Sequence, residues 1–299
     1  MKAVLAVNLS LLFILLLHSI KRDWTFQQEG AGDLRNRVVG ARLAKIGRDP
    51  YFYKWKNGDS YAYLDYANAD TNTVSVITAT PLFHRLIAII SDYDQKTISV
   101  LWFVVEYLAL LAIILAGVFL TTDEIKKIVV TNIGVLFTYT HAWALHLLQG
   151  QMYIFVAALL MFVGFLLTRH QHRRLFSILA GIATWVLIFV RPISIVSLIP
   201  FALSNKRFAT YLAATTVCSL AYLAFIFVNE NEKMQWINYK AAMVEQVKVH
   251  QNLPRHAVTI DRLPAIKKLE GLDLEAQQKA AIEHPFPDHS ENGNVFFDL

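Results

Sequence analysis

The sequence contains a single cysteine, Cys218, among 299 residues. One cysteine cannot form an internal disulfide, and it offers too few ligands for a cysteine-based zinc or iron–sulfur site. Charged residues are also scarce: they make up 17% of the chain, against roughly 25% in soluble domains. With a hydrophobic content of 55%, these shortages exclude a disordered chain, a collagen-like repeat and a simple soluble domain. They favour an integral membrane protein.

Several catalytic and nucleotide-binding motifs are missing as well. The chain has no GxGxxG, P-loop, HExxH, GxSxG or CxxC pattern, so dinucleotide chemistry, ATP-driven transport and zinc peptidase activity are not favoured. The net charge of +5 is modest. On a membrane protein such a charge reflects the orientation of loops, and we predict no nucleic-acid partner.

Long apolar runs are what the chain has in abundance, and they predict an all-α polytopic membrane protein. Each run is close to the roughly 20 residues that a bilayer span needs. A cleavable signal peptide is the alternative for the first run, but no small-x-small site precedes Lys21, so we prefer an uncleaved span. The predicted spans are residues 3–20, 99–120, 128–148, 152–168, 175–190 and 208–228.

The apolar run 175–203 is too long for one upright span. As a helix it would measure about 43 Å, against roughly 30 Å of hydrocarbon. Arg191 and Pro192 lie within it; proline breaks a helix, and arginine is costly in the membrane centre. We therefore predict a span over 175–190, a break, and a re-entrant half-helix over 193–203. The alternative is one tilted span, which would move the C-terminal segment to the cytoplasm.

The short basic connections orient the chain. Lys2 and the connections 126–127, 169–174 and 206–207 carry the positive charge, whereas the connection 149–151 has no Lys or Arg. By the positive-inside rule the basic connections are cytoplasmic. The outer loop 21–98 and the polar C-terminal segment 229–299 then lie outside. We predict a membrane module over 1–228 and expect no site in 229–299, whose charges are typical of a solvated surface.

The outer loop contains the most informative candidate, Asp33. A turn at Gly30–Asp33 precedes a helical pattern with Leu34, Val38, Ala41 and Ile46 near one face, so this helix is predicted to lie along the membrane surface. Two interpretations of Asp33 stay open: an N-cap of that helix, and a catalytic carboxylate just outside the first span.

Four other polar residues lie in or beside the apolar runs. Arg191 either pairs with carbonyls at the broken helix or binds an anionic headgroup, because intramembrane charges are functional candidates. His141 and Glu106 either bond a neighbouring helix or contact substrate. Gln151, beside Gly150, is either a turn residue or a substrate-binding one.

Taken in order, five features resemble the polytopic glycosyltransferases of the GT-C superfamily, and specifically glycosyltransferase family 87. A single first span is followed by an outer Asp, and an amphipathic helix then ends in a Gly-x-Asp-Pro-Tyr pattern. A Thr-Pro-Leu-Phe segment precedes the second span, a Gly-Gln pair opens a later one, and a basic residue with Pro interrupts a long apolar run. The residues concerned are Asp33, Gly47–Tyr51, Thr80–Phe83, Gly150–Gln151 and Arg191–Pro192.

The resemblance implies a GT-C-like helical bundle whose outer loop carries amphipathic helices, and the transfer of a hexose, mannose-like, from a polyprenyl-phosphate donor to a lipid or glycan acceptor. Asp33 would be the catalytic base, and Arg191 would bind the leaving phosphate. The substrate-binding candidates are Arg191, Gln151, Arg35, Arg42 and His141. We expect contact with membrane lipids and a location in the bacterial plasma membrane.

The adjacent acidic pair found in many GT-C enzymes is absent, so no cofactor or metal ligand is predicted and dependence on a divalent metal stays open. Two other function classes also stay open. A transporter or flippase for lipid-linked sugars would share the basic outer site and the broken helix. A truncated, non-catalytic membrane protein would make Asp33 and Arg191 dispensable.

Overall fold

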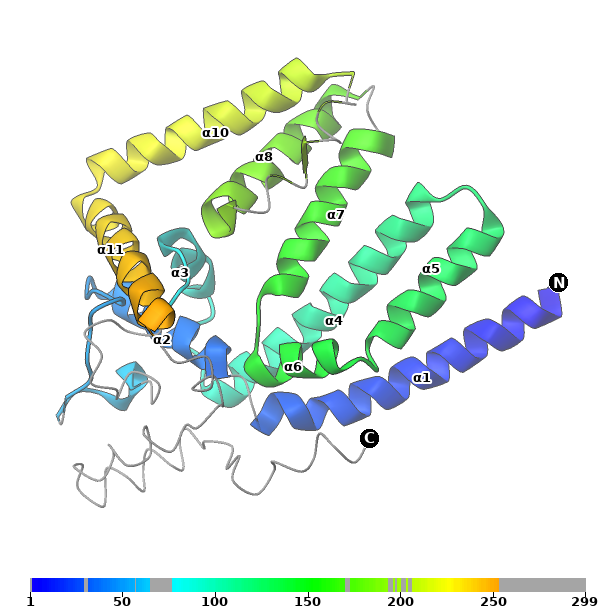
Figure 1. Ribbon diagram of the computed structural model, residues 1–299, viewed down its shortest axis with the longest axis horizontal. Coiled ribbons are helices and arrows are strands. Elements are labelled where there is room, and N and C mark those ends of the chain that lie inside the picture. The colour runs from blue at the N-terminus through cyan, green and yellow to red at the C-terminus, as the bar shows by residue number, and fades with distance from the viewer. Residues whose placement is uncertain are drawn as a thin grey trace.

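The computed structural model describes residues 2–29, 32–56, 58–64, 77–169, 173–192 and 206–252, together with 196, 198, 199 and 203. Within this part of the chain every regular element is helical, as the sequence predicted (Figure 1). The helices are α1 (Lys2–Glu29), α2 (Gly32–Lys45), α3 (Pro81–Ile87), α4 (Gln95–Leu120), α5 (Glu124–Phe137), α6 (His141–Gln149), α7 (Tyr153–Arg169), α8 (Arg174–Val190), α10 (Phe208–Val228) and α11 (Glu230–Asn252), with a 3-10 turn, η1, at Tyr61–Tyr63.

Two of these helices, α4 and α10, are long and apolar enough to cross a membrane, and a third candidate results if the bent pair of α5 and α6 is one span. Large apolar side chains are exposed along them, for example Leu108 at 57% and Val217 at 65%. A water-soluble protein rarely leaves so many large apolar groups uncovered. Helices α7 and α8 are shorter apolar helices, and the predicted first span lies within α1, which continues to Glu29.

The predicted straight span over 128–148 is wrong in one respect: the chain bends by 53° between α5 and α6. The Thr138 hydroxyl donates to the carbonyl of Val135, 2.7 Å away, and the Thr140 hydroxyl accepts from the amide of Trp143 at 3.3 Å. Threonine side chains that bond nearby backbone groups offer the chain an alternative to a continuous helix. The predicted turn after α6 is confirmed, since Gly150 has a φ of 63° in the left-handed region.

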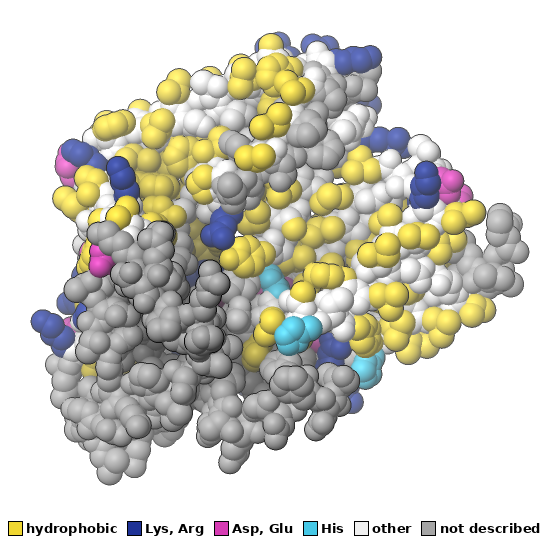
Figure 2. Space-filling view, in the orientation of Figure 1, with side chains coloured by type: hydrophobic (Ala, Val, Ile, Leu, Met, Phe, Trp, Pro, Cys, Tyr) yellow, Lys and Arg dark blue, Asp and Glu magenta, His cyan; other side chains and the backbone are white. Residues whose placement is uncertain are grey.

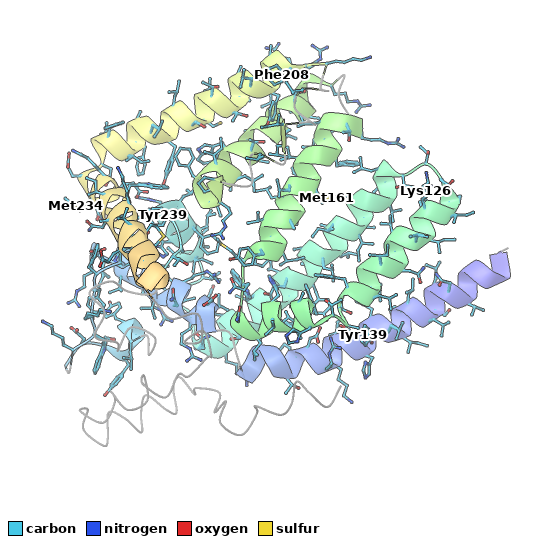
Figure 3. All side chains as sticks on the ribbon, viewed as in Figure 1. Lys126, Tyr139, Met161, Phe208, Met234 and Tyr239 are labelled. Carbon is cyan, nitrogen blue, oxygen red and sulfur yellow. The ribbon has the colours of Figure 1, made fainter. Side chains whose placement is uncertain are left out.

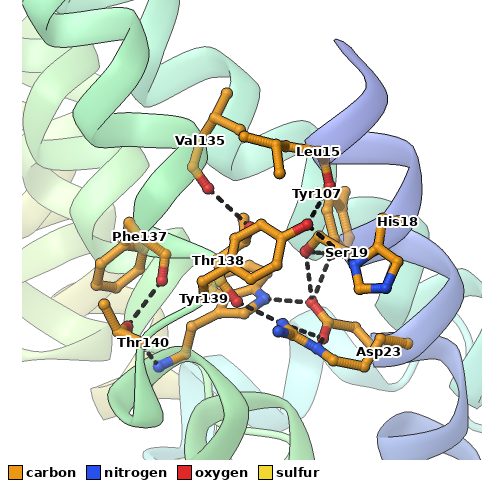
Figure 4. Close-up of polar contacts among 12 residues, drawn as sticks. Leu15, His18, Ser19, Asp23, Tyr107, Val135, Phe137, Thr138, Tyr139 and Thr140 are labelled. Carbon is orange, nitrogen blue, oxygen red and sulfur yellow. Dashed lines mark hydrogen bonds and ion pairs between the residues drawn. The ribbon is translucent and has the colours of Figure 1, made fainter. Parts of the chain in front are cut away.

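The bend between α5 and α6 is attached to α1 (Figure 4). The Tyr139 hydroxyl donates to the Leu15 carbonyl at 2.7 Å, and the Arg22 guanidinium donates to the Thr138 carbonyl at 2.5 Å. Arg22 also lies over the Tyr139 ring, 4.9 Å from its centroid. The Thr138 carbonyl at the bend therefore has its donor on another helix.

Helices α8 and α10 run parallel to each other (Figure 1). Early in both helices the Thr215 hydroxyl donates to the Gly181 carbonyl at 3.2 Å, and later the Phe189 and Tyr222 rings lie 4.8 Å apart. Because α8 ends at Val190, residues 175–203 are not one continuous helix, and the chain returns to begin α10. Most of the predicted re-entrant half-helix, 193–203, lies outside the described residues.

The helices give the molecule two ends. Figure 3 places Lys126, beside the α4–α5 connection, and Phe208, at the start of α10, away from Met234 and Tyr239 of α11. The end of α7 and the start of α8 lie on the Phe208 side in Figure 1, and α2, α3 and α11 lie on the other. The short basic connections that are described thus share one end of the bundle, while the direction of that end relative to a membrane stays a prediction.

At the opposite end, α2 is inserted into the bundle. Its residues 34–41 are all buried, and its apolar side chains share a core with α3 and with the ends of α4, α8 and α10. This helix is therefore covered by protein, while its placement along a membrane surface stays a prediction. The polar residues of α2 suggested a solvent-exposed face, but Arg37 hydrogen-bonds to the α6–α7 turn inside the protein.

The described part of the C-terminal segment packs against the bundle. Residues 230–252 form α11, in which Glu232 and Ala242 are fully buried. Glu232 accepts from the Tyr222 hydroxyl at 2.7 Å and is paired with Arg85 of α3 at 2.5 Å. The interpretation of these charges as a solvated surface is wrong for Glu232, whereas the side chains of Glu230 and Lys233, 76% and 42% exposed, lie at the surface as expected. Residues 253–299 lie outside the described part of the chain.

Candidate functional site

Asp33 lies where the first turn of α2 meets the turn between α6 and α7. Gly32 is already helical, so Asp33 is inside the first turn and is not the N-cap. Its Oδ2 accepts a hydrogen bond from the Gln151 amide nitrogen and lies 3.7 Å from the Arg37 guanidinium. The Asp33 side chain is 42% exposed. A carboxylate at this end of a helix is stabilised by the helix dipole while its exposed surface stays open to a substrate.

Arg37 is a member of this site that the sequence analysis did not single out. Its guanidinium donates to the Gly150 carbonyl at 2.7 Å and to Gln151 Oε1 at 3.1 Å. Burial lowers the pKa of Arg37, and the nearby charge of Asp33 partly restores it. An arginine remains charged in proteins despite such a shift. The spacing of four residues from Asp33 was the available signal, because such pairs are neighbours on a helix.

Arg191 approaches the same turn from the end of α8. Its guanidinium donates to the Tyr153 hydroxyl at 3.3 Å and lies 5.2 Å from the centre of the Tyr153 ring. The charge of Arg191 also contributes to the lowered pKa of Arg37. Two guanidinium groups therefore act on one small region, and the positive potential there favours an anionic ligand.

A cavity of about 360 Å³ adjoins these contacts. It is lined by both Gln151, the partner of Asp33, and Tyr153, the partner of Arg191. This volume is within the roughly 300–1,000 Å³ range of small-molecule sites. The remaining lining residues are Phe137, Ala142, Trp143, Leu145, His146, Gln149, Ile154 and Ala157. In Figure 2 a few histidine side chains gather in the lower middle, where Figure 1 places α6 and α1.

The comparisons with known proteins bear on what this site does. The sequence profile of glycosyltransferase family 87 matches residues 78–261, more than half of the chain. The chain belongs to glycosyltransferase family 87. It is therefore a glycosyltransferase of the GT-C type, with membrane helices, as the resemblance implied. No curated protein and no solved structure matches it.

The family match divides the predicted site residues. Gln151, Arg191 and His141 lie within it, whereas Asp33, Arg35 and Arg42 precede it. The structure nevertheless brings Asp33 to Gln151, across the boundary of the match. For this family 87 enzyme, the candidate site thus combines residues of the matched region with α2, which precedes that region.

Three of the predicted substrate-binding residues do not line this cavity. The Arg42 guanidinium donates to the carbonyls of Ser91, Ala62 and Tyr93, at 2.7, 3.1 and 3.1 Å, so it ties α2 to the following loops. Arg35 is 6% exposed, within the buried part of α2. His141 begins α6 and is exposed, and it is not among the residues that line the cavity.

Two further carboxylates near the outer segment are already engaged. Asp23 is fully buried and accepts from the side chains of Ser19, Tyr107, Trp143 and Arg22; Figure 4 shows this cluster. Asp49 accepts from the Tyr51 amide at 2.9 Å, and burial raises the pKa of Asp49. Neither is as open to a substrate as Asp33.

The motifs that flank α2 hold it in position. The Tyr51 hydroxyl donates to the Ala79 carbonyl at 2.9 Å, just before α3 begins. His84 of α3 is packed so closely against α2 that a Cβ on Gly40 would lie 2.6 Å from its Nε2. Leu82 and Phe83 of the Thr-Pro-Leu-Phe segment share a core with Leu34 and Val38 of α2, so this segment and His84 help to position the helix that carries Asp33. In the described part of the chain, no group of three or more His, Cys, Asp or Glu side chains is arranged to hold a metal ion.

Proposed function

We propose that this enzyme moves a hexose, mannose-like, from a polyprenyl-phosphate donor to a hydroxyl of a lipid or glycan acceptor at the outer face of a bacterial plasma membrane. One observation carries the proposal. A half-exposed carboxylate and an arginine are held beside one cavity, Asp33 through Gln151 and Arg191 through Tyr153. Glycosyl transfer from a lipid phosphate needs a base for the acceptor and a cation for the leaving group.

Asp33 is the proposed general base. The acceptor hydroxyl gives its proton to the Asp33 carboxylate while its oxygen bonds to the anomeric carbon of the donor sugar. The bond between that carbon and the phosphate oxygen breaks, and its electron pair leaves with the lipid phosphate. The contacts of Asp33 with Gln151 and Arg37 hold the carboxylate in one orientation, which general base catalysis requires.

Arg191 is the proposed partner of the phosphate. Within the described part of the chain its side chain makes one hydrogen bond, to Tyr153, through one nitrogen of the fork. The rest of a guanidinium fork suits a phosphate, whose charge it stabilises as the bond breaks. Arg37 is buried, and its donors go to Gly150 and Gln151. Arg37 therefore acts as a positioning residue that also adds positive potential.

A transfer assay with the purified protein tests the proposal. Polyprenyl-phosphate mannose with a radiolabelled sugar is offered together with membrane lipid acceptors, and labelled product is measured. Arg191→Ala should insert normally but lose most transfer, and Arg191→Lys should retain part of it, because the charge remains while the fork is lost. Arg48→Ala is a matched control: this arginine is exposed and pairs with Asp59.

Three outcomes would contradict the proposal. Wild-type protein that transfers no sugar from any polyprenyl-phosphate donor would remove the donor class. Movement of the lipid-linked sugar across vesicles without transfer would favour the flippase alternative. Full activity of Arg191→Ala would remove Arg191 from the site.

A further inference from the structure

Glu106 and His146 form a buried pair next to the proposed site. Glu106 lies on α4 and is fully buried, and its Oε1 is 3.2 Å from Nε2 of His146 on α6. The His146 ring also stacks on the Trp143 ring, with centroids 5.6 Å apart. Carboxylate–imidazole pairs orient the histidine ring and select which ring nitrogen carries the proton.

In the described helices, polar atoms of Glu106 and His146 lack the hydrogen-bond partners that other buried carboxylates of this protein have. Among the described residues, neither carboxylate oxygen of Glu106 nor Nε2 of His146 has a partner in regular hydrogen-bond geometry, although the Trp102 indole, one turn away on α4, lies next to the carboxylate. By contrast, the buried Glu232 accepts from both Tyr222 and Arg85. A buried carboxylate without such partners is costly in a membrane helix, and intramembrane acids of this kind mark functional sites.

The location of His146 defines which part of a substrate it meets. His146 lines the cavity together with Gln151 and Tyr153. Gln151 contacts the proposed base and Tyr153 contacts the proposed phosphate-binding arginine. In the reaction, the group between the base and the leaving phosphate is the donor sugar. The cavity is therefore the place for the sugar ring.

We propose that the cavity binds the hexose ring of the donor and that His146, held by Glu106, accepts a hydrogen bond from a ring hydroxyl. This inference rests on the proposed function and names the residues that recognise its sugar. Because Nε2 lies 3.2 Å from the Glu106 carboxylate, the proposal places the ring proton on Nε2 and leaves the lone pair of Nδ1 to a hydroxyl donor. Glu106 is a positioning residue, because it acts through His146.

The cavity is lined mostly by apolar side chains, and the polar group that argues for a sugar is His146. The apolar residues of the cavity, such as Trp143 and Ile154, suit the C–H faces of a sugar ring, and His146, Gln149 and Gln151 offer polar contacts. An isoprenoid chain has no hydroxyl and would leave His146 without a polar partner, whereas Gln151 is already bonded to Asp33, Arg37 and Gln149. Buried polar groups that lose their partners strongly disfavour such a ligand.

A pair of lipid probes tests the inference. The full-length protein in detergent is titrated with a short-chain polyprenyl-phosphate mannose and with the same lipid phosphate lacking the sugar. The wild type should bind the sugar-bearing probe more tightly. His146→Ala should weaken binding of that probe by about 3–10-fold, the contribution of one hydrogen bond, while the sugar-free probe changes by less than about twofold.

Conservative variants separate binding from a structural role. His146→Asn places an amide near the position of Nδ1, so it should recover part of the preference for the sugar-bearing probe, and Glu106→Gln should give an intermediate loss. Glu232→Gln is the matched control, because it alters a buried carboxylate held by Arg85 and Tyr222. It should lower the melting temperature and leave the preference for the sugar-bearing probe unchanged.

The outcomes distinguish this inference from the proposed function. If His146→Ala weakened binding of both probes to the same extent, or changed the binding of neither, the result would overturn this inference alone. A wild type that binds both probes equally would also overturn it and leave the lipid-phosphate donor in place. A wild type that binds neither probe would overturn the proposed function and this inference together.

Discussion

Asp23 and Asp33 follow one another closely in the sequence, and their carboxylates lie in different surroundings. Asp23 is fully buried, and four side chains donate hydrogen bonds to its carboxylate. One of them, the Arg22 guanidinium, lies 2.6 Å from Oδ1. Asp33 is 42% exposed and contacts one amide and, at 3.7 Å, one guanidinium. Asp23 lies near the end of α1, and Asp33 lies in the first turn of α2.

The two clusters differ in how many of the lone pairs of the carboxylate oxygens already accept hydrogen bonds. The oxygens of Asp23 join α1, α4 and α6 through Ser19, Tyr107 and Trp143, so a substrate could reach Asp23 only by breaking several charge-assisted hydrogen bonds. The contacts of Asp33 fix its orientation but leave surface for a hydroxyl. The first arrangement suits stability and the second suits proton transfer.

Replacement of Asp33 should have the largest effect on activity. Asp33→Asn keeps the size of the side chain but cannot accept a proton, so transfer should fall by roughly 10²–10⁴-fold while the melting temperature stays close to that of the wild type. Product formation from the labelled donor and a thermal melt measure the two effects. Asp92→Asn is the control, because Asp92 is an exposed carboxylate paired with Lys45. Full activity of Asp33→Asn would show that another residue is the general base.

Replacement of Asp23 should instead act on stability. Asp23→Ala leaves Arg22 and Trp143 without their acceptor, and loss of one partner from a buried charged cluster costs about 3–5 kcal/mol. Denaturant or thermal unfolding in detergent measures the loss. Asp23→Asn retains an oxygen acceptor and should lose less. If Asp23→Ala were as stable as the wild type but inactive, the roles assigned to the two carboxylates would be reversed.

A substitution on α2 should disturb the Asp33 cluster without touching the Asp23 cluster. Gly40→Ala places a Cβ 2.6 Å from Nε2 of His84, and overpacking of this kind costs about 1–3 kcal/mol. Transfer should fall as well, because α2 must shift. The double variant Gly40→Ala/His84→Ala removes the clash and should recover part of both losses. No change in stability for Gly40→Ala would show that α2 is not held by this contact.

The smallest expected effect is a dependence of stability on pH through His84. Burial lowers the pKa of His84 from 6.5 to about 3. Below pH 6.5 the unfolded chain takes up a proton that the folded protein does not. The free energy of unfolding therefore decreases as the pH is lowered, by up to about 1.4 kcal/mol per pH unit. Melting temperatures between pH 6.5 and 5 measure this slope. His84→Gln should flatten it, and an unchanged slope would assign it to another group.

Local signals in the sequence predicted much of this architecture. The end of α8 before Arg191 follows from Pro192, and the end of α6 follows from Gly150, whose left-handed conformation glycine adopts at no cost. The helix that begins near Asp33 was also expected. Proline, glycine and apolar runs act within a few residues, so a sequence pattern records them directly.

Other features were missed because they depend on distant partners. The bend at Thr138–Thr140 is held by Arg22 and by the Leu15 carbonyl of α1. The burial of α2 depends on Arg37 reaching Gly150 and Gln151, more than 100 residues later in the chain. Asp33 was selected as the base from the resemblance to the family, and its neighbours in space could not be deduced from spacing.

The sequence by itself determined that the chain is helical, rich in apolar segments, broken at Pro192 and a member of glycosyltransferase family 87. Apolar periodicity and family motifs carry that information one segment at a time. Tertiary structure alone decided which charges are saturated and which stay open. Asp23 and Asp33 are the same residue type, and only the donors that other helices bring to each carboxylate separate a structural role from a proposed catalytic one.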